Sequence, residues 1–320
     1  MAKSTTSVQP YPRIDNEKDK FHGFIDDSRL KPHIKKIKKE ELKKIVVEAI
    51  QYANVKSGRE ILKIPDNALP EELSKAYKKA AKELFTYFVK YCGDPASSAH
   101  DCLNKHYSLI AKEQFRNRTI QKERMNAGWR YQYIAKDSAS ISERFENVSD
   151  IGTAEADFNV VISDNSSKQK ITIYVSVKNR TNTLGGQDWP KAIRALEDIA
   201  KSDKNRFGPY LCVFGIAMDK GQRQIRLEGK TGNPYSFNTE IWLSDFFWPF
   251  FANFNYDEVI KIVLEVLIEK GTKSSLDLII PSEIIEEFGA ICMRYDLLNN
   301  QGNFNDAFRL ADLFCGKLKL

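Results

Sequence analysis

Residues 153–198 constrain the fold more strongly than any other part of the chain. They contain two runs in which apolar and polar residues alternate, 154–162 and 171–177, separated by a polar segment at 163–170. Alternation of this kind is typical of a half-buried β-strand, and a short polar segment between two such runs is typical of a turn. The sequence therefore predicts a β-hairpin over 154–177.

The period of two along a strand places reactive side chains together. Residues two apart project from one face, so Glu155 and Asp157 share a face of the first strand, and Ser176 and Lys178 share a face of the second. If these faces coincide, two carboxylates, a hydroxyl and an ammonium converge at the end of a sheet. Carboxylates facing a lysine are typical of a site that holds Mg²⁺ beside an attacking water.

The composition is that of a folded globular chain. A length of 320 residues can bury a substantial core in one large domain or two smaller ones, and 42% hydrophobic and 29% charged residues are ordinary values. The formal net charge of +6 is compatible with nucleic acid binding but does not require it. There is no apolar run of membrane-spanning length, no secretory signal and no disulfide-type spacing among the five cysteines. We therefore expect a cytoplasmic protein with free thiols and no membrane partner.

Helical patterns fill most of the region before the hairpin. Apolar residues recur at three- and four-residue steps over 42–53 and 73–88, which predicts two amphipathic helices. A third helix is expected over 99–125, ending before Gly128, and a short helix over 137–147 is expected to lead into the hairpin.

Two polar segments lie nearer the N-terminus. Residues 1–20 have no periodic apolar face and predict a flexible arm. Residues 31–44 carry seven lysines against two glutamates. This run is either a solvated helix start or a patch that contacts phosphates by releasing counterions.

The chain after the hairpin predicts a helix and then a buried strand. Asp188 is a natural N-cap for a helix that carries Pro190 in its first turn. The unbroken apolar run at 210–217 is typical of a central strand buried on both faces. Further strands are expected over 222–227 and 240–243.

The C-terminal part returns to helical patterns. Helices are expected over 256–269 and 282–298. The aromatic run at 246–251 is too dense for a base-stacking platform, which needs exposed rings, and it indicates core or dimer packing instead.

Four residues in the helical region suggest a zinc site. Zinc favours sulfur and nitrogen ligands, and Cys102 and His106 are one helical turn apart, with Cys92 and His100 nearby. The spacing matches no common finger pattern and includes no Cys-x-x-Cys pair. Buried cysteine and histidine on a helix surface are therefore the preferred interpretation.

The order helix, hairpin, helix, strand, with acids on the first hairpin strand and a lysine on the second, resembles the PD-(D/E)xK nuclease superfamily, in particular its type II restriction endonucleases. The resemblance covers about residues 138–217. It implies an α/β (α+β) fold, in which a central mixed β-sheet is flanked by helices and joined to a helical N-terminal region. The expected segments are an arm at 1–20, a helical region at 21–136 that packs on the core and contacts DNA, a catalytic core at 137–245 and a C-terminal helical region at 246–320.

The resemblance also implies roles for the hairpin residues. Asp157 would bind Mg²⁺, the Val177 backbone carbonyl would be a further metal ligand, and Lys178 would lie beside the attacking water. The implied reaction is hydrolysis of DNA phosphodiesters by in-line attack, with the metal and the lysine stabilising the extra negative charge.

The sequence departs from the family pattern at Ser176. This residue stands where the second metal-binding carboxylate belongs, and a serine cannot supply the negative charge. Glu155 is the simplest substitute, with Glu143 ranked beside it, Glu146 from the same preceding helix as a further candidate, and Glu197 from the following helix ranked below the first two.

Base reading is expected from loops that flank the sheet. Arginine, asparagine and glutamine read purine edges bidentately, although each is equally suited to a phosphate contact. The candidates are Asn179, Arg180, Asn182 and Gln187 after the hairpin, with Arg223, Arg226 and Lys230 further along. A palindromic target would accompany a homodimer, and a DNA methyltransferase would share the target site.

Three hypotheses follow. The first is a Mg²⁺-dependent, site-specific endonuclease of double-stranded DNA, that is, a type II restriction endonuclease. The second is a non-catalytic DNA-binding protein on a nuclease-like scaffold that has lost its second carboxylate at Ser176. The third is a structural or partner-binding protein whose lysines are simply solvated.

Overall fold

The chain forms two compact units. The computed structural model describes residues 27–57, 68–184, 188–228, 231–270 and 279–318. The predicted arm at 1–20 and the candidates Gln187 and Lys230 lie outside these residues. Unit 1 comprises Met1–Lys56 and Asn126–Gly271, and unit 2 comprises Ser57–Met125 and Thr272–Leu320.

Unit 1 is built on a mixed sheet. Among the described residues it has six strands in the order β1-β2-β3-β4-β6-β5. The β1, β2 and β3 strands pair antiparallel, β3, β4 and β6 pair parallel, and β5 is antiparallel to β6. The strands are β1 (Asn147–Asp150), β2 (Phe158–Ser163), β3 (Lys170–Lys178), β4 (Tyr210–Ile216), β5 (Arg223–Gln224) and β6 (Thr239–Trp242). This mixed sheet, flanked by helices, confirms the predicted α/β fold class.

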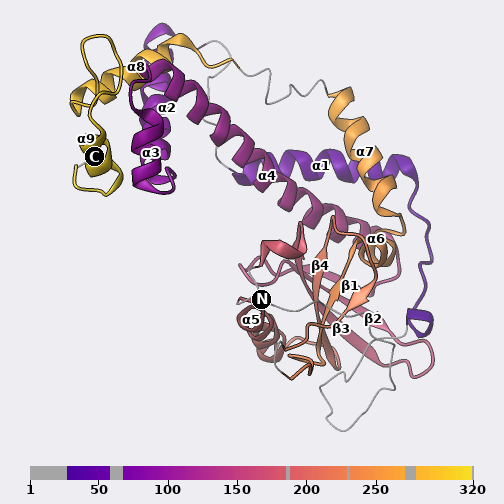
Figure 1. Ribbon diagram of the computed structural model, residues 1–320. Coiled ribbons are helices and arrows are strands. Elements are labelled where there is room, and N and C mark those ends of the chain that lie inside the picture. Colours follow the sequence, from indigo (N-terminus) through magenta and orange to yellow (C-terminus); the bar gives the residue numbers. More distant parts are fainter. Residues whose placement is uncertain (1–26, 58–67, 185–187, 229–230, 271–278, 319–320) are drawn as a thin grey trace. The chain divides into compact units, whose positions relative to one another are not determined.

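Helices cover both faces of the sheet (Figure 1). On one face, Val160, Val175 and Val213 pack in a core with residues of four helices. These helices are α1 (Lys39–Ser57), α4 (Tyr107–Ile141), α6 (Ser244–Ala252) and α7 (Tyr256–Glu269). On the other face, Tyr174 and Phe214 pack against α5 (Trp189–Ser202). The β4 strand is therefore buried on both sides, as the apolar run at 210–217 predicted. The β3 strand is buried on both sides as well, so the prediction of a half-buried strand over 171–177 was wrong, because α5 covers the face that carries its polar residues.

The predicted hairpin is present, but its first strand is shorter than expected. The β2 and β3 strands pair from Phe158 opposite Val175 to Ser163 opposite Lys170. Before β2 the chain turns, because the Thr153 hydroxyl accepts a hydrogen bond from the Ala156 N–H at 3.0 Å, and the Thr153 N–H donates to the Ala156 carbonyl at 3.1 Å. The prediction of a strand from residue 154 was therefore wrong, and residues 153–156 do not follow a period of two.

The helix α4 is longer than the sequence predicted. It runs for 35 residues without ending at Gly128, and it includes residues 137–141 of the short helix expected over 137–147. The rest of that prediction was wrong, because residues 142–146 are not helical and lead into β1. A separate helix, α3 (Pro95–Cys102), precedes it.

Gly128 lies close to the Asn179 side chain, since a Cβ at Gly128 would be 3.5 Å from Asn179 Oδ1. Glycine weakens a helix by only about 1 kcal/mol relative to alanine, which packing in unit 1 overcomes.

Unit 2 has a core of its own. Phe85 and Phe88 of α2 (Pro70–Lys90) contact Phe288 of α8 (Ser282–Arg294), with ring centroids 5.8 and 5.9 Å apart. The helix α9 (Ala307–Phe314) contributes Leu310 and Leu313 to the same core. The C-terminal region expected at 246–320 is therefore divided, because α6 and α7 belong to unit 1, whereas α8 and α9 belong to unit 2.

The aromatic run at 246–251 lies in the core of unit 1. Phe247, Trp248, Phe250 and Phe251 on α6 are buried. This confirms the core interpretation over a base-stacking platform. No helix in the described ranges combines the length and the apolar character needed to span a membrane.

Candidate active site at the end of strand β3

Asp157 lies at the open end of the hairpin and bonds to the neighbouring strand. Its Oδ2 accepts a hydrogen bond from the Val177 N–H at 2.6 Å, and its own N–H donates to the Val175 carbonyl at 2.8 Å. The regular β2–β3 ladder begins only at Phe158. The carboxylate therefore takes the place of a backbone acceptor just before the first residue of β2. This hydrogen bond holds it against the last residues of strand β3.

Lys178 is the residue that follows this contact. It ends β3 and pairs with Ile216 of β4 in the parallel ladder. Its side chain is half-buried, and within the described residues no hydrogen bond or ion pair engages its ammonium group. The structure thus brings Asp157 and Lys178 to the same end of the hairpin, as the sequence predicted.

Ser176, where the resemblance to the nuclease superfamily leads us to expect a carboxylate, is buried. It is only 1% exposed, pairs with Phe214 of β4 and lies between the buried residue Tyr174 and Lys178 along one face of β3. A carboxylate there would be costly unless a cation or a hydrogen-bond donor paired with it.

Glu155 lies on the turn that leads into β2. Its side chain is exposed, and no other described residue forms a hydrogen bond or ion pair with it. The argument that Glu155 shares a strand face with Asp157 was wrong, because residue 155 belongs to the turn closed by Thr153. Glu155 nevertheless remains close to Asp157 along the chain, two residues away.

Glu143 and Glu146 lie toward the other end of the hairpin. Glu146 forms an ion pair with Lys170 at 2.7 Å and accepts a hydrogen bond from Ser163, and these contacts lower its carboxyl pKa. Ser163 ends β2, about 20 Å along the strand from Asp157 at 3.3 Å per residue.

Glu143 lies on the turn between α4 and β1, where its φ of 53° is in the left-handed region. The hydrogen bond to Glu41 raises the pKa of Lys35, and the negative charge of Glu143 adds to this effect. The Lys35 backbone N–H donates to the carbonyl of Ser142, the residue before Glu143, at 3.4 Å. The structure brings neither Glu143 nor Glu146 to Asp157.

Glu197 on α5 lies near the beginning of the parallel strands. It accepts a hydrogen bond from the Thr239 hydroxyl at 2.7 Å and forms an ion pair with Lys201 at 3.3 Å. Thr239 pairs with Cys212, four residues before Ile216, the partner of Lys178. Four residues of strand span about 13 Å, so the structure does not bring Glu197 to Asp157 and Lys178.

A carboxylate that the sequence reasoning missed, Asp219, fixes the loop after Lys178. Its Oδ2 accepts hydrogen bonds from the Thr181 N–H and hydroxyl, both at 2.7 Å, and its Oδ1 pairs with Arg180 at 3.1 Å. Asp219 follows β4, and an acid just beyond a central parallel strand was the signal that could have found it.

The three candidate DNA-binding residues after β3 are differently placed. Arg180 is 55% exposed although it pairs with Asp219, and Asn182 is exposed on a 3₁₀ turn, Thr181–Thr183. The Asn179 side chain lies against Gly128 of α4. Arg180 and Asn182 are therefore available to a ligand at this end of the sheet.

Arg223 and Arg226 are committed to interactions within unit 1. Arg223 is 12% exposed and its Nε donates to Glu240, which is fully buried, at 3.0 Å. Arg226 lies over the Trp189 ring, 5.3 Å from its centroid, and burial lowers its pKa. The prediction of Arg223 as a base reader is therefore not supported, because its guanidinium neutralises a buried carboxylate.

The residues of the suggested zinc site do not form a cluster. Cys102 is buried, which raises the pKa of its thiol to about 12, whereas the His100 side chain is 87% exposed. His106 Nδ1 lies 2.8 Å from the Ser108 hydroxyl. Across the described ranges, no three histidine, cysteine or acidic side chains are grouped so as to hold a metal ion.

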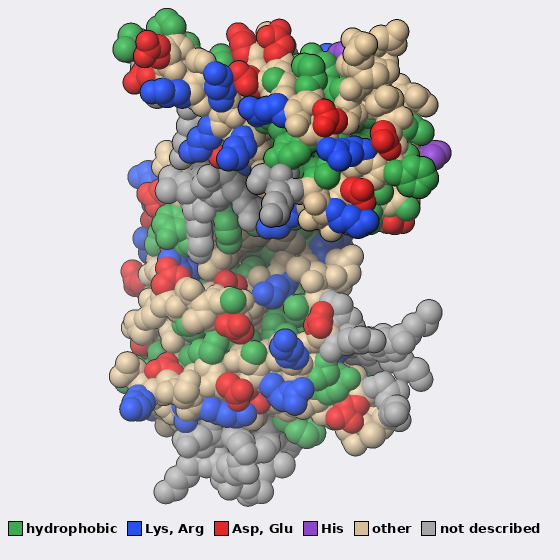
Figure 2. Space-filling view, turned by 90° about the vertical axis from the view of Figure 1, so that its left-hand side faces the viewer, with side chains coloured by type: hydrophobic (Ala, Val, Ile, Leu, Met, Phe, Trp, Pro, Cys, Tyr) green, Lys and Arg blue, Asp and Glu red, His purple; other side chains and the backbone are tan. Residues whose placement is uncertain are grey.

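Charged side chains of both signs lie together on one face of the molecule. On the face of the molecule drawn in Figure 2, Lys and Arg side chains are interspersed with Asp and Glu side chains. The described residues of that face therefore form no continuous basic surface.

The sequence matches no family model and no curated protein.

Proposed function

We propose that the chain is a Mg²⁺-dependent, site-specific endonuclease that hydrolyses phosphodiester bonds of double-stranded DNA, in the manner of type II restriction endonucleases. The observation that carries this proposal is the hydrogen bond that the Asp157 carboxylate accepts from the Val177 N–H. Val177 directly precedes the half-buried Lys178. The contact lies where an antiparallel hairpin meets a parallel strand reached through α5, which is the element order of the family that the sequence resembles.

The donors at this end of the hairpin fit magnesium. Mg²⁺ binds through one or two carboxylates and keeps several waters, and the Asp157 carboxylate, the Glu155 carboxylate and the Val177 carbonyl would hold it. The ion would polarise the phosphoryl group and supply positive charge as negative charge develops. Glu155 is the proposed second carboxylate because Glu146, Glu197 and Asp219 already have strong partners.

Lys178 is the proposed catalytic side chain that acts beside the metal ion. Its ammonium group, which no described carboxylate pairs with, would hold the attacking water and stabilise the pentacovalent phosphorus. Arg180 and Asn182, exposed beyond Lys178, would contact the DNA next to the scissile bond.

The test is cleavage of plasmid DNA by the purified protein with MgCl₂. Discrete fragments are expected, and Asp157→Ala and Lys178→Ala are each expected to lower the cleavage rate by at least roughly 10²-fold while DNA retardation persists. Lys204→Ala, which removes an exposed lysine between α5 and β4, is the matched control and should cleave normally. Undiminished cutting by either site variant would contradict the assignment.

Glu155→Gln tests the second carboxylate, with Asp150→Asn as its control, because Asp150 pairs with Lys136 at 2.8 Å. Glu155→Gln is expected to lose activity, whereas Asp150→Asn is expected to keep it. Sequencing the fragment ends would give the target site. A palindromic site would support the proposed homodimer and the proposed partner methyltransferase of the same specificity.

A second candidate function is DNA binding without cleavage. The observation that favours it is the buried Ser176 at the position of a metal-binding carboxylate. Retardation of DNA with no cleavage in MgCl₂ would support this function over the first.

A further inference from the structure

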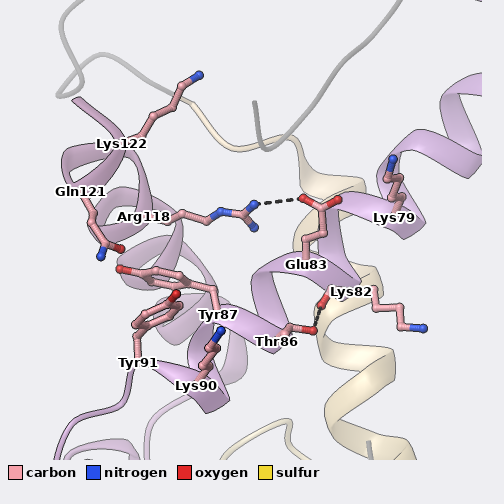
Figure 3. A pocket seen from close by; sticks show the side chains of 10 residues that line it. All are labelled: Lys79, Lys82, Glu83, Thr86, Tyr87, Lys90, Tyr91, Arg118, Gln121 and Lys122. Atoms are coloured by element: carbon pink, nitrogen blue, oxygen red, sulfur yellow. Dashed lines mark hydrogen bonds and ion pairs between the residues drawn. The ribbon is translucent and has the colours of Figure 1, made fainter. Parts of the chain in front are cut away.

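Unit 2 contains a groove between α2 and the first half of α4, remote in sequence from the hairpin (Figure 3). Its volume is about 500 Å³. Cationic residues and neutral hydrogen-bonding residues make up nearly all of its lining. The lining residues are Lys79, Lys82, Glu83, Thr86, Tyr87, Lys90 and Tyr91 from α2 with Arg118, Gln121 and Lys122 from α4.

The charge of this groove is strongly one-sided. Five of its lining residues are cations and only one, Glu83, is an acid. Glu83 is already paired with Arg118 at 3.0 Å. None of the four lysines forms an ion pair with another described residue. The lysines therefore create a positive potential that the protein does not neutralise, which attracts an anionic ligand.

Arg118 has hydrogen-bonding capacity that the described residues leave unused. Its side chain is 16% exposed and extends from α4 toward Glu83, as Figure 3 shows. Its Nη2 donates to Glu83, whereas its enclosed Nη1 has no acceptor among the described residues. Nearly all buried polar groups in proteins are paired, so this guanidinium is suited to a further oxygen ligand after a small side-chain movement.

The neutral lining residues favour the same kind of ligand. Tyr87 and Tyr91 lie side by side with ring centroids 4.9 Å apart, and Thr86 and Gln121 add a hydroxyl and an amide. Hydroxyl and amide side chains, together with lysine and arginine, are the groups that contact phosphate oxygens in protein–DNA complexes.

We propose that this groove binds the phosphodiester backbone of a DNA strand without reading its sequence. The inference rests on the proposed function for the identity of the polyanion, and it adds a second DNA-contacting surface in unit 2. Lys82 and Lys90 are exposed on α2 and contact the phosphates, and Arg118 with the two tyrosines lines the groove beside them.

The test measures DNA affinity by fluorescence anisotropy in the full chain, with Asp157→Ala present so that no cleavage occurs. The double variant Lys82→Gln, Lys90→Gln is expected to bind a labelled duplex roughly tenfold more weakly at about 0.1 M salt, and to reduce the salt dependence of log K by about 2. The loss should be the same for duplexes of unrelated sequence, because phosphate contacts carry no base information.

The control is Lys112→Gln, Arg116→Gln, which removes the same charge from exposed positions of α4 outside the groove. Its affinity should fall much less. Equal losses in both double variants, or no loss in the groove variant, would overturn the groove assignment. Neither result would contradict the proposed cleavage by Asp157 and Lys178, which the plasmid assay tests separately. Failure of the parent chain to bind any duplex would overturn the proposed function as well. Thermal unfolding of each variant establishes that unit 2 is folded.

Discussion

The ion pair of Arg223 and Glu240 provides a sharp test of how unit 1 is stabilised. Glu240 is fully buried on β6, and Arg223 on β5 is 12% exposed with its Nε 3.0 Å from the carboxylate. Replacing Arg223 by Met leaves the carboxylate buried without its guanidinium. Breaking a buried pair in this way costs about 3–5 kcal/mol, and at about 2–4 °C per kcal/mol the Tm of unit 1 should fall by roughly 6–20 °C.

Two further variants separate this effect from simple loss of packing. In the double variant Arg223→Met, Glu240→Gln the buried negative charge is removed, so it should be more stable than Arg223→Met alone. Arg180→Met is the surface control, because Arg180 is 55% exposed and its pair with Asp219 is expected to be worth less than about 1 kcal/mol.

Thermal unfolding followed by circular dichroism measures these differences, and DNA anisotropy is measured on the same samples. An Arg223→Met variant with unchanged Tm but weaker, sequence-dependent DNA binding would refute the reasoning and restore Arg223 as a base reader. A double variant less stable than Arg223→Met would also contradict it.

Two further predictions concern packing and burial. Gly215→Ala should destabilise unit 1 by about 1–3 kcal/mol, because its Cβ would lie 2.2 Å from a Phe247 ring carbon, whereas Gly128→Ala within α4 should be neutral or stabilising by up to about 1 kcal/mol; urea unfolding compares the two. At pH 8, a thiol reagent should modify the exposed Cys315 rapidly and Cys102 slowly, as mass spectrometry of the labelled chain would show. Because burial raises the Cys102 pKa from 9.0 to about 12, the neutral thiol favours folding, and this contribution should be lost as pH rises from 9 toward 12.

Several elements could be predicted from the sequence because their signal is local. The strand β3, the strand β4 and the helix α7 agree with their predicted bounds to within one residue, and α7 matches at both ends. The β4 strand was marked by an unbroken apolar run and α7 by a three- and four-residue apolar period, and both patterns follow from which side chains face a core. Asp157 and Lys178 came from the same reasoning, since both lie at the end of a well-defined hairpin.

Other features depended on contacts between residues distant in the sequence. Local periodicity could not reveal that Glu197 bonds to Thr239, that Glu146 pairs with Lys170, or that Asp219 fixes the loop after β3. Nor could it reveal that the two-unit division separates α7 from α8, because each unit is assembled from discontinuous segments.

The sequence by itself therefore determined the hairpin, the fold class and the pair of residues on which the proposed chemistry depends. The tertiary structure alone decided which acids are free and which cations are already neutralised. The physical reason is that a charged side chain has the same sequence signature whether it faces solvent, a ligand or an internal partner, and only its spatial neighbours distinguish these cases. Arg223 against Glu240, in contrast to Lys178, which pairs with no acid of the described residues, is the clearest instance in this chain.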